Sequence, residues 1–253
     1  MPDLHDHPPT SDGGQRSPGP LALLRAAGNV LRSMPGMAVT TVEYLRHRHA
    51  VDHEVVDLEG PAPDPDPDRD FPGDPSTVLR RSAGHGPLYR RTYRVEVEDA
   101  RTGPEELIGR LLVDPNRASP TEVSMFEAVH GTDRGLGAEF LVHMPGPWDA
   151  PVRVVERTGT SFRFATLRGH MEAGEIEFRA AWGDGGRLVF EIESWARSGD
   201  RLYDWIYDKV PLAREMQLHM WVHVLEQVAV MAGGTPRGQI SVTTSRWKAG
   251  SGG

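Results

Sequence analysis

The chain of 253 residues contains no cysteine, and this absence removes several kinds of chemistry together. Disulfide bridges, thiolate metal sites, iron–sulfur clusters and cysteine nucleophiles are all excluded. Positive charge is also in deficit, because 28 Lys and Arg residues face 36 Asp and Glu residues, for a formal net charge of −8. A protein without a global positive field is not expected to bind nucleic acid.

Long apolar runs are missing as well. No stretch reaches the roughly 18 apolar residues that a membrane helix needs, and the first residues, 1–6, lack the basic start of a signal peptide. We therefore expect a cytoplasmic protein with no membrane insertion. The sequence also has no P-loop and no Gly-x-Ser-x-Gly elbow, and the glycines of 131–137 lack a strand–helix setting. No cofactor is predicted.

The ends of the chain differ in composition from its middle. Residues 1–20 are rich in Pro and Gly and predict a disordered tail, and helix-like spacing predicts an N-terminal helical segment over 21–56. Six prolines interleaved with seven acids between Asp57 and Pro75 predict a stiff acidic linker over 57–83. The main domain is expected over 84–234, followed by a C-terminal tail over 235–253.

The main domain alternates apolar and polar residues in a succession of short segments. Tyr93, Val95 and Val97 share one strand face, opposite Arg94 and Glu96. Further strands are expected at 123–129, 138–144, 152–157, 162–167, 175–181 and 187–196, which makes about seven. The glycine-rich run 183–186 predicts an antiparallel hairpin between the last two, with one face of the sheet exposed to water.

Helical spacing appears at two places in this domain. Pro104, followed by two acids, predicts the start of a short helix, and an apolar stripe predicts a long helix from Ala213 to Met231. These elements together predict an α+β fold in which a curved antiparallel sheet of about seven strands wraps around the long C-terminal helix. Such a helix-grip arrangement leaves space for an internal cavity.

Two segments resemble a known family. Residues 151–155 and the run Thr-Leu-Arg-Gly-His-Met-Glu-Ala-Gly-Glu at 166–175 look like the domain-of-unknown-function family nineteen-ninety, and 84–89 and 144–149 look like its actinobacterial branch. The resemblance covers roughly 84–234 and implies a START-like (SRPBCC) helix-grip fold. Ala165, Arg168 and Ile176 depart from the family pattern. The resemblance implies a pocket and carries over no catalytic residue.

His170, Glu172 and Glu175 are the best candidates for chemistry. Gly169 and Gly174 allow the backbone to turn sharply around them, so that an imidazole and a carboxylate could form an acid–base pair. The other interpretation is that both carboxylates bond the amides of the turn and that His170 packs against a neighbouring strand.

Other side chains are candidates for ligand binding. Thr166 is expected to point inward with Phe164 and to orient a ligand or bond a neighbour, and Trp148 is expected to act as a lid or as a loop anchor. Gln217 could offer a polar tip to a ligand beside the apolar stripe that contains Met220, or it could form a hydrogen bond from the helix to the sheet.

Arg153, Arg197 and Arg201 could hold a carboxylate or phosphate through paired donors. Their alternative fate is a cross-strand ion pair with Glu191 or Glu193.

A metal site is not predicted. His219 and His223 are four residues apart on one helix face, a spacing that suits a shared metal, but the sequence offers no third ligand.

Three functions remain open from the sequence. The first is the binding of a small, largely apolar ligand between the sheet and the long helix. The second is a cyclase, dehydratase or isomerase that acts on a polyketide-like or terpenoid substrate, with His170 and Glu172 moving protons. The third is a scaffold that binds a protein partner through residues 21–56.

Overall fold

The computed structural model describes residues 51–60, 70–129, 134–144, 149–199 and 211–247, with side chains from 217 onward in the last range. The tail predicted over 1–20 and residues 21–50 of the predicted helical segment lie outside these ranges.

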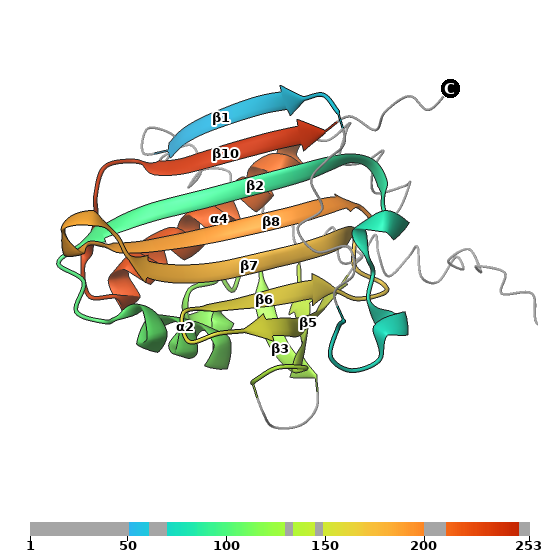
Figure 1. The fold of residues 1–253 in the computed structure, drawn as a ribbon, viewed down its shortest axis with the longest axis horizontal. Coiled ribbons are helices and arrows are strands. Elements are labelled where there is room, and N and C mark those ends of the chain that lie inside the picture. Colours follow the sequence, from blue (N-terminus) through green and yellow to red (C-terminus); the bar gives the residue numbers. More distant parts are fainter. Residues whose placement is uncertain (1–50, 61–69, 130–133, 145–148, 200–210, 248–253) are drawn as a thin grey trace, which may run out of the picture.

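A large mixed sheet of ten strands dominates the described residues (Figure 1). The strand order is β1-β10-β2-β8-β7-β6-β5-β4-β3, and the short β9 pairs with β2 off this path. Every pairing is antiparallel except that of β1 with β10, which is parallel. The strands are β1 (Val51–Leu58), β2 (His85–Glu98), β3 (Met125–Val129), β4 (Glu139–His143), β5 (Asp149–Arg157), β6 (Ser161–Thr166), β7 (Glu172–Trp182), β8 (Leu188–Ser198), β9 (Thr235–Pro236) and β10 (Ile240–Trp247).

The α+β class and the strands expected within the main domain are confirmed, from β2 through β8. Two predictions at its borders are wrong. Residues 51–56 form the strand β1 and not a helix, and the expected C-terminal tail contains β10, which lies between β1 and β2. The reason is the period-two pattern of β10, whose buried Ile240 and Val242 alternate with polar residues and need a sheet face to cover them.

Two α-helices lie among the described residues. The helix α2 (Pro104–Val113) starts with proline and two acids, as predicted, and buries the four aliphatic side chains Leu107, Ile108, Leu111 and Leu112. The long helix α4 (Pro211–Met231) packs against β2 and β8 behind the sheet (Figure 1). Within the described ranges, no helix is long and apolar enough to cross a membrane.

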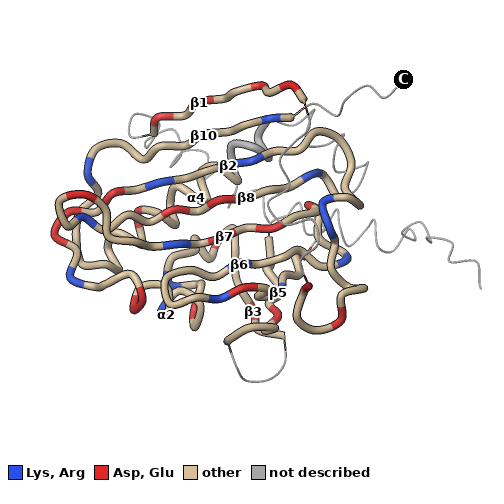
Figure 2. Tube along the Cα trace, viewed as in Figure 1, with Lys and Arg blue, Asp and Glu red and all other residues tan. Residues whose placement is uncertain are grey.

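The two faces of the sheet have different characters. We call the face that packs against α4 the core face, and it carries the buried Tyr93, Val95 and Val97 of β2 together with Phe190 and Ile192 of β8. The opposite face, the outer face, is charged, with ion pairs between β2, β8 and β7. Residues of both signs recur along these three strands (Figure 2). This division confirms the predicted alternation of apolar and polar residues along β7 and β8.

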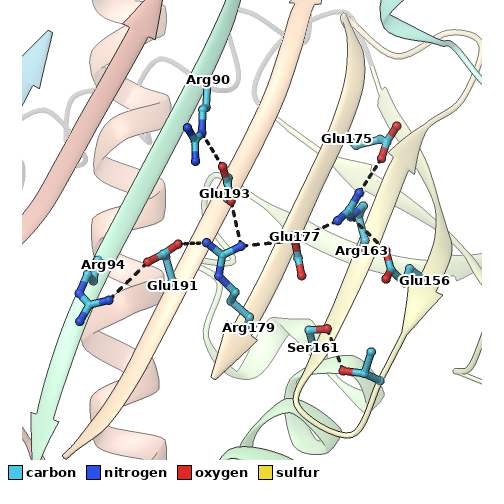
Figure 3. Close-up of polar contacts among 11 residues, drawn as sticks. Arg90, Arg94, Glu156, Ser161, Arg163, Glu175, Glu177, Arg179, Glu191 and Glu193 are labelled. Carbon is cyan, nitrogen blue, oxygen red and sulfur yellow. Dashed lines mark hydrogen bonds and ion pairs between the residues drawn. The ribbon is translucent and has the colours of Figure 1, made fainter. Parts of the chain in front are cut away.

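Ion pairs link the charges of the outer face into a network (Figure 3). Arg179 of β7 contacts Glu177, Glu191 and Glu193. Arg163 of β6 contacts the carboxylates of Glu156, Glu175 and Glu177, and it shares Glu177 with Arg179. The network therefore joins β6, β7 and β8 through side chains as well as through the backbone.

Residues 70–83 pack on the outer face, so the linker predicted over 57–83 is wrong in this part. Phe71 and Val78 are buried there in a second, small core with Val155, Ala165 and Leu167. Residues 57 and 58 belong to β1, while the proline-rich 61–69 lie outside the described ranges. A segment with two large apolar side chains gains more by covering an apolar patch than by remaining in water.

Candidate functional site

A polar cluster interrupts the otherwise apolar core face near the start of β2 and β7. Strand alternation places Arg91 on the same face as Tyr93, and Glu172 is the first residue of β7. Gln217 reaches the same place from α4, the helix that packs on this face. Together with Tyr89 and Arg246, described below, these residues form what we call the polar end of the core face.

Gln217 connects the two charged members of this cluster. Its Oε1 atom accepts a hydrogen bond from Nη1 of Arg91 at 3.0 Å, and its Nε2 atom donates to the Glu172 carboxylate at 3.2 and 3.3 Å. Arg91 and Glu172 are also 3.9 Å apart as an ion pair. The helix-to-sheet hydrogen bond that was one expectation for Gln217 is thus present.

Burial decides the electrostatics of this cluster. Only 10% of the Arg91 side chain and 18% of the Glu172 side chain are exposed. Burial raises the pKa of Glu172, and the charge of Arg91 and the hydrogen bond from Gln217 oppose that rise. Glu172 is therefore a carboxyl group whose proton is held more tightly than that of an ordinary glutamate.

His170 lies in the turn before β7, and it does not pair with the Glu172 carboxylate. Its Nδ1 atom accepts a hydrogen bond from the main-chain N–H of Glu172 at 2.8 Å. Burial lowers the pKa of His170 to about 4, so the ring is neutral at pH 7 and carries its proton on Nε2. The expected acid–base pair is replaced by a link from the His170 ring to the backbone of the strand that carries Glu172.

Two arginines approach Tyr89 at the polar end. The Arg91 guanidinium carbon lies 5.0 Å from the centre of the Tyr89 ring, and that of Arg246 lies 5.9 Å from it. Arg246 stands on β10 directly opposite Tyr89 on β2. The neighbouring Thr244, opposite Arg91, is buried, and its hydroxyl is 3.1 Å from Nε2 of His53 on β1.

Aromatic side chains border the polar cluster. Trp221 follows Gln217 by four residues, hence by about one turn of α4, and lies beside Tyr93 and Phe178 with ring centres 6.5 and 5.7 Å apart. The cluster therefore stands next to a large apolar surface.

Three other predicted ligand residues are buried within the core. Phe164 belongs to an aromatic group with Phe126, Phe140, Phe162 and Phe178, and Met220 is buried on α4. The Thr166 hydroxyl accepts a hydrogen bond from the N–H of Gly174 at 3.0 Å and lies within donor distance of the carbonyls of Leu79 and Gly174. Thr166 therefore bonds its neighbours, which was the second expectation for it.

Arg153, Glu175 and Arg197 lie on the outer face, away from the polar end, so the structure does not bring them together with Glu172. Alternation along their strands is the reason, since each has the opposite parity to the core-face residues of its own strand. Glu175 pairs with Arg163, and Arg197 donates to the carbonyl of Gly86.

The guanidinium of Arg153 donates all of its hydrogen bonds to atoms of this chain. It makes five hydrogen bonds, to Glu139 twice, to the carbonyls of Pro72 and Asp74, and to the Thr77 hydroxyl. These bonds hold residues 72–77 against β5. A guanidinium has five N–H donors, so none is left for a ligand.

The remaining candidates divide into two groups. Trp148 and Arg201 lie outside the described residues. His219 is buried in the core and His223 is partly buried on the same helix, and the described residues contain no group of three or more potential ligands that could hold a metal ion.

Arg91, Tyr89 and Arg246 are site residues that the sequence analysis missed. The signal for Arg91 was available, because the alternation that places Tyr93 and Val95 inside also places residue 91 inside. The position of Arg246 depends on β10, which was expected to be a tail.

Part of the chain matches a known protein family. Residues 117–227 match the model of the family described as Domain of unknown function (DUF1990), so the resemblance inferred from the sequence is confirmed over that range. No curated protein matches the chain.

Several solved structures are similar to this chain over part of its length. A conserved protein from Geobacillus kaustophilus is 13% identical with a TM-score of 0.41, covering 59% of this chain and 99% of that one. Ara h 8.0201 is 11% identical with a TM-score of 0.39, covering 57% and 97%. A norcoclaurine synthase mutant from Thalictrum is 13% identical with a TM-score of 0.37, covering 56% and 96%.

Proposed function

We propose that this protein binds a small, largely apolar molecule at the polar end of the core face, between the sheet and α4. The observation that carries the proposal is the buried cluster of Arg91, Gln217 and Glu172. Burying two charged groups costs free energy, and apolar side chains of similar volume would serve stability as well or better. A polar cluster retained at such a position is better explained by recognition than by stability.

The surroundings of the cluster suit a molecule with an apolar body. Tyr93, Phe178 and Trp221 supply aromatic surface directly beside it. Sites for small molecules combine mostly apolar walls with a few polar groups that fix orientation. In this proposal the aromatic rings hold the body of the ligand, and the polar cluster orients one end of it.

The experiment uses N-phenyl-1-naphthylamine, an uncharged apolar probe whose fluorescence rises on burial. We expect saturable binding to the full chain, and Trp221→Ala to weaken it about tenfold, since loss of one large aromatic contact costs about 1 to 2 kcal/mol. Val230→Ala is the control, because Val230 lies on the same helix and is 68% exposed. Absence of saturable binding, or equal weakening by both substitutions, would contradict the proposal.

A second candidate function is proton transfer on a bound substrate, as in a cyclase, dehydratase or isomerase. The raised pKa of Glu172 favours it, because a general acid or base works best when its pKa is near the working pH. Glu172 is the proposed group in this case, and His170 orients its strand.

The test of this second candidate is loss of substrate from a panel of polyketide-like β-hydroxy ketones. We expect Glu172→Gln to abolish turnover while probe binding persists. Turnover that survives in Glu172→Gln would assign the reaction to another group.

The proposal of a protein partner concerns a different part of the chain. Residues 51–56 are strand β1 and pair with β10, which leaves 21–50 as the segment able to bind a partner. Deletion of residues 1–50, which spares β1, is the appropriate variant. An unchanged set of co-purified proteins would contradict this proposal.

A further inference from the structure

We infer that the ligand carries an anionic group of the carboxylate type, which Arg91 and Arg246 bind beside Tyr89. This inference rests on the proposed binding function and adds the chemical class of the ligand. The apolar body would extend from Tyr89 toward Tyr93 and Trp221.

The register of β2 and β10 brings the two arginines to one place. Arg246 is opposite Tyr89, and Arg91 follows Tyr89 by two residues, so all three side chains stand on the core face. Both guanidinium carbons lie within 6 Å of the centre of the Tyr89 ring. A carboxylate at the edge of this ring can accept hydrogen bonds from guanidinium groups, which match its planar geometry.

Arg246 differs from the arginines of the outer face. Arg90, Arg94, Arg163 and Arg179 each contact at least one glutamate, as Figure 3 shows. Arg246 makes no ion pair within the described ranges, and its buried Nε atom has no hydrogen-bond partner there. The Nε atom of Arg163 also lacks a hydrogen-bond partner, but a Glu156 carboxylate oxygen lies 3.4 Å from it. A buried donor without an acceptor is costly in a folded protein, and an anion bound at this place would remove that cost.

The distribution of charge around Tyr89 also favours an anion. The carboxylate of this cluster, Glu172, is on β7, which is separated from β2 by β8 and lies on the side opposite β10. On the β10 side lie Arg246 and His53, and Asp57 of β1 stands opposite Arg246 in the parallel register. Partial burial and the charge of Arg91 lower the pKa of His53. A ligand anion between Arg91 and Arg246 would be attracted by both guanidinium groups.

The arrangement would also use the polar cluster already described. Gln217 holds Arg91 from α4 by a hydrogen bond and holds Glu172 with its other end. Arg91 is therefore fixed in place before a ligand arrives, so binding need not order its side chain.

The experiment compares two ligands that differ only in their head group. Dodecanoate and dodecanol are titrated against the full chain with N-phenyl-1-naphthylamine bound as the reporter, at pH 7.5 and constant salt. We expect dodecanoate to displace the probe at about tenfold lower concentration than dodecanol, because hydrogen bonds to charged groups exceed those to neutral groups.

Substitutions assign that preference to residues. We expect Arg246→Gln to remove the preference for dodecanoate, whereas Arg91→Lys, which keeps the charge but loses the planar fork, reduces it. Arg94→Gln is the matched control, because Arg94 lies on the same strand but on the outer face, where it pairs with Glu96 and Glu191. The thermal midpoint and circular dichroism spectrum of each variant establish that it folds.

The outcomes separate this inference from the proposed function. If the probe does not bind at all, the binding function itself fails. If the probe binds and both ligands displace it equally in the wild type, the function stands and the anionic group is refuted. A preference that persists in Arg246→Gln and Arg91→Lys would place the anion elsewhere and would also overturn the inference.

Discussion

The Nδ1 atom of His170 accepts a hydrogen bond from the main-chain N–H of Glu172, 2.8 Å away. This contact requires a neutral ring, and burial lowers the pKa of His170 from 6.5 to about 4. As pH falls below 6.5, the unfolded chain takes up a proton at this residue before the folded chain does. We therefore predict that His170 makes the free energy of unfolding fall between pH 6.5 and pH 4, by about 2 kcal/mol.

The comparison of wild type with His170→Gln isolates this contribution, because glutamine keeps an acceptor for the N–H of Glu172 but does not titrate. Urea unfolding at several pH values should show a smaller acid-dependent loss in the variant. Parallel curves for the two proteins would show that the folded and unfolded pKa values of His170 are similar.

Gly174 is required by the close approach of β7 to β8. A Cβ atom at this position would lie 2.0 Å from the main-chain oxygen of Trp195, and a backbone oxygen cannot rotate away. We predict that Gly174→Ala lowers the free energy of unfolding by about 3 kcal/mol or more. Gly109→Ala is the control, since Gly109 lies in α2 with nothing within 4 Å of the added atom and the change should stabilise the helix by about 0.5 kcal/mol. A similar thermal midpoint for both variants would contradict this account.

Arg153 fastens residues 72–77 to β5 through its five hydrogen bonds. We predict that Arg153→Lys lowers the free energy of unfolding by about 2 to 4 kcal/mol, because a lysine at this buried position can replace only part of the five hydrogen bonds. Limited proteolysis should then cut the chain faster between residues 70 and 83. Affinity for N-phenyl-1-naphthylamine should stay within about twofold of wild type. A larger change would show that Arg153 contributes to ligand binding.

His143 joins the edge strand β3 to β4 and β5. Its Nε2 atom is 2.7 Å from a Glu127 carboxylate oxygen and its Nδ1 atom is 3.1 Å from an Asp149 carboxylate oxygen. The bond to Glu127 above all, with help from Asp149, raises the pKa of His143 above 6.5. The stabilisation is complete below pH 6.5 and is lost as pH rises through the folded-state pKa.

The side chain of His143 is about one-third exposed, so solvent screens its contacts, and we predict a contribution of only about 0.5 kcal/mol. A nuclear magnetic resonance titration of the imidazole protons, assigned by the signal missing from His143→Gln, measures the pKa directly. A titration midpoint at or below 6.5 would refute the predicted direction.

The strands within 85–198 could be predicted from the sequence because their pattern is local. Alternation along β7 and β8 assigns Ile176, Phe178 and Phe190 to the core, and the structure buries Phe178 and Phe190 and packs the partly buried Ile176 against them. The same rule, continued two residues back from Tyr93, would have identified Arg91 as a charged residue on the apolar face. Glu172 and Gln217, two of the polar residues singled out in the sequence, do contact each other in the structure, but their shared partner Arg91 was not expected.

The borders of the domain could not be predicted in the same way. The strand β1 pairs in parallel with β10, so the place of Val51 depends on that of Ile240, far along the chain. Arg153 gave a similar difficulty, because its acceptors include Pro72 and Asp74 from the segment expected to be a linker. Contacts between residues far apart in the sequence determine where these segments pack, and local spacing does not predict such contacts.

The position of β10 in the interior of the sheet sets an order of events during synthesis. A ribosome releases residues 51–58 before the other described strands, yet the strand against which they pair, residues 240–247, emerges only after β2 to β8. Until then β2, which β10 covers on one side, presents an open edge along much of its length. The sheet can thus be completed only after β10 has emerged, and the new chain is exposed to edge-to-edge association during that interval.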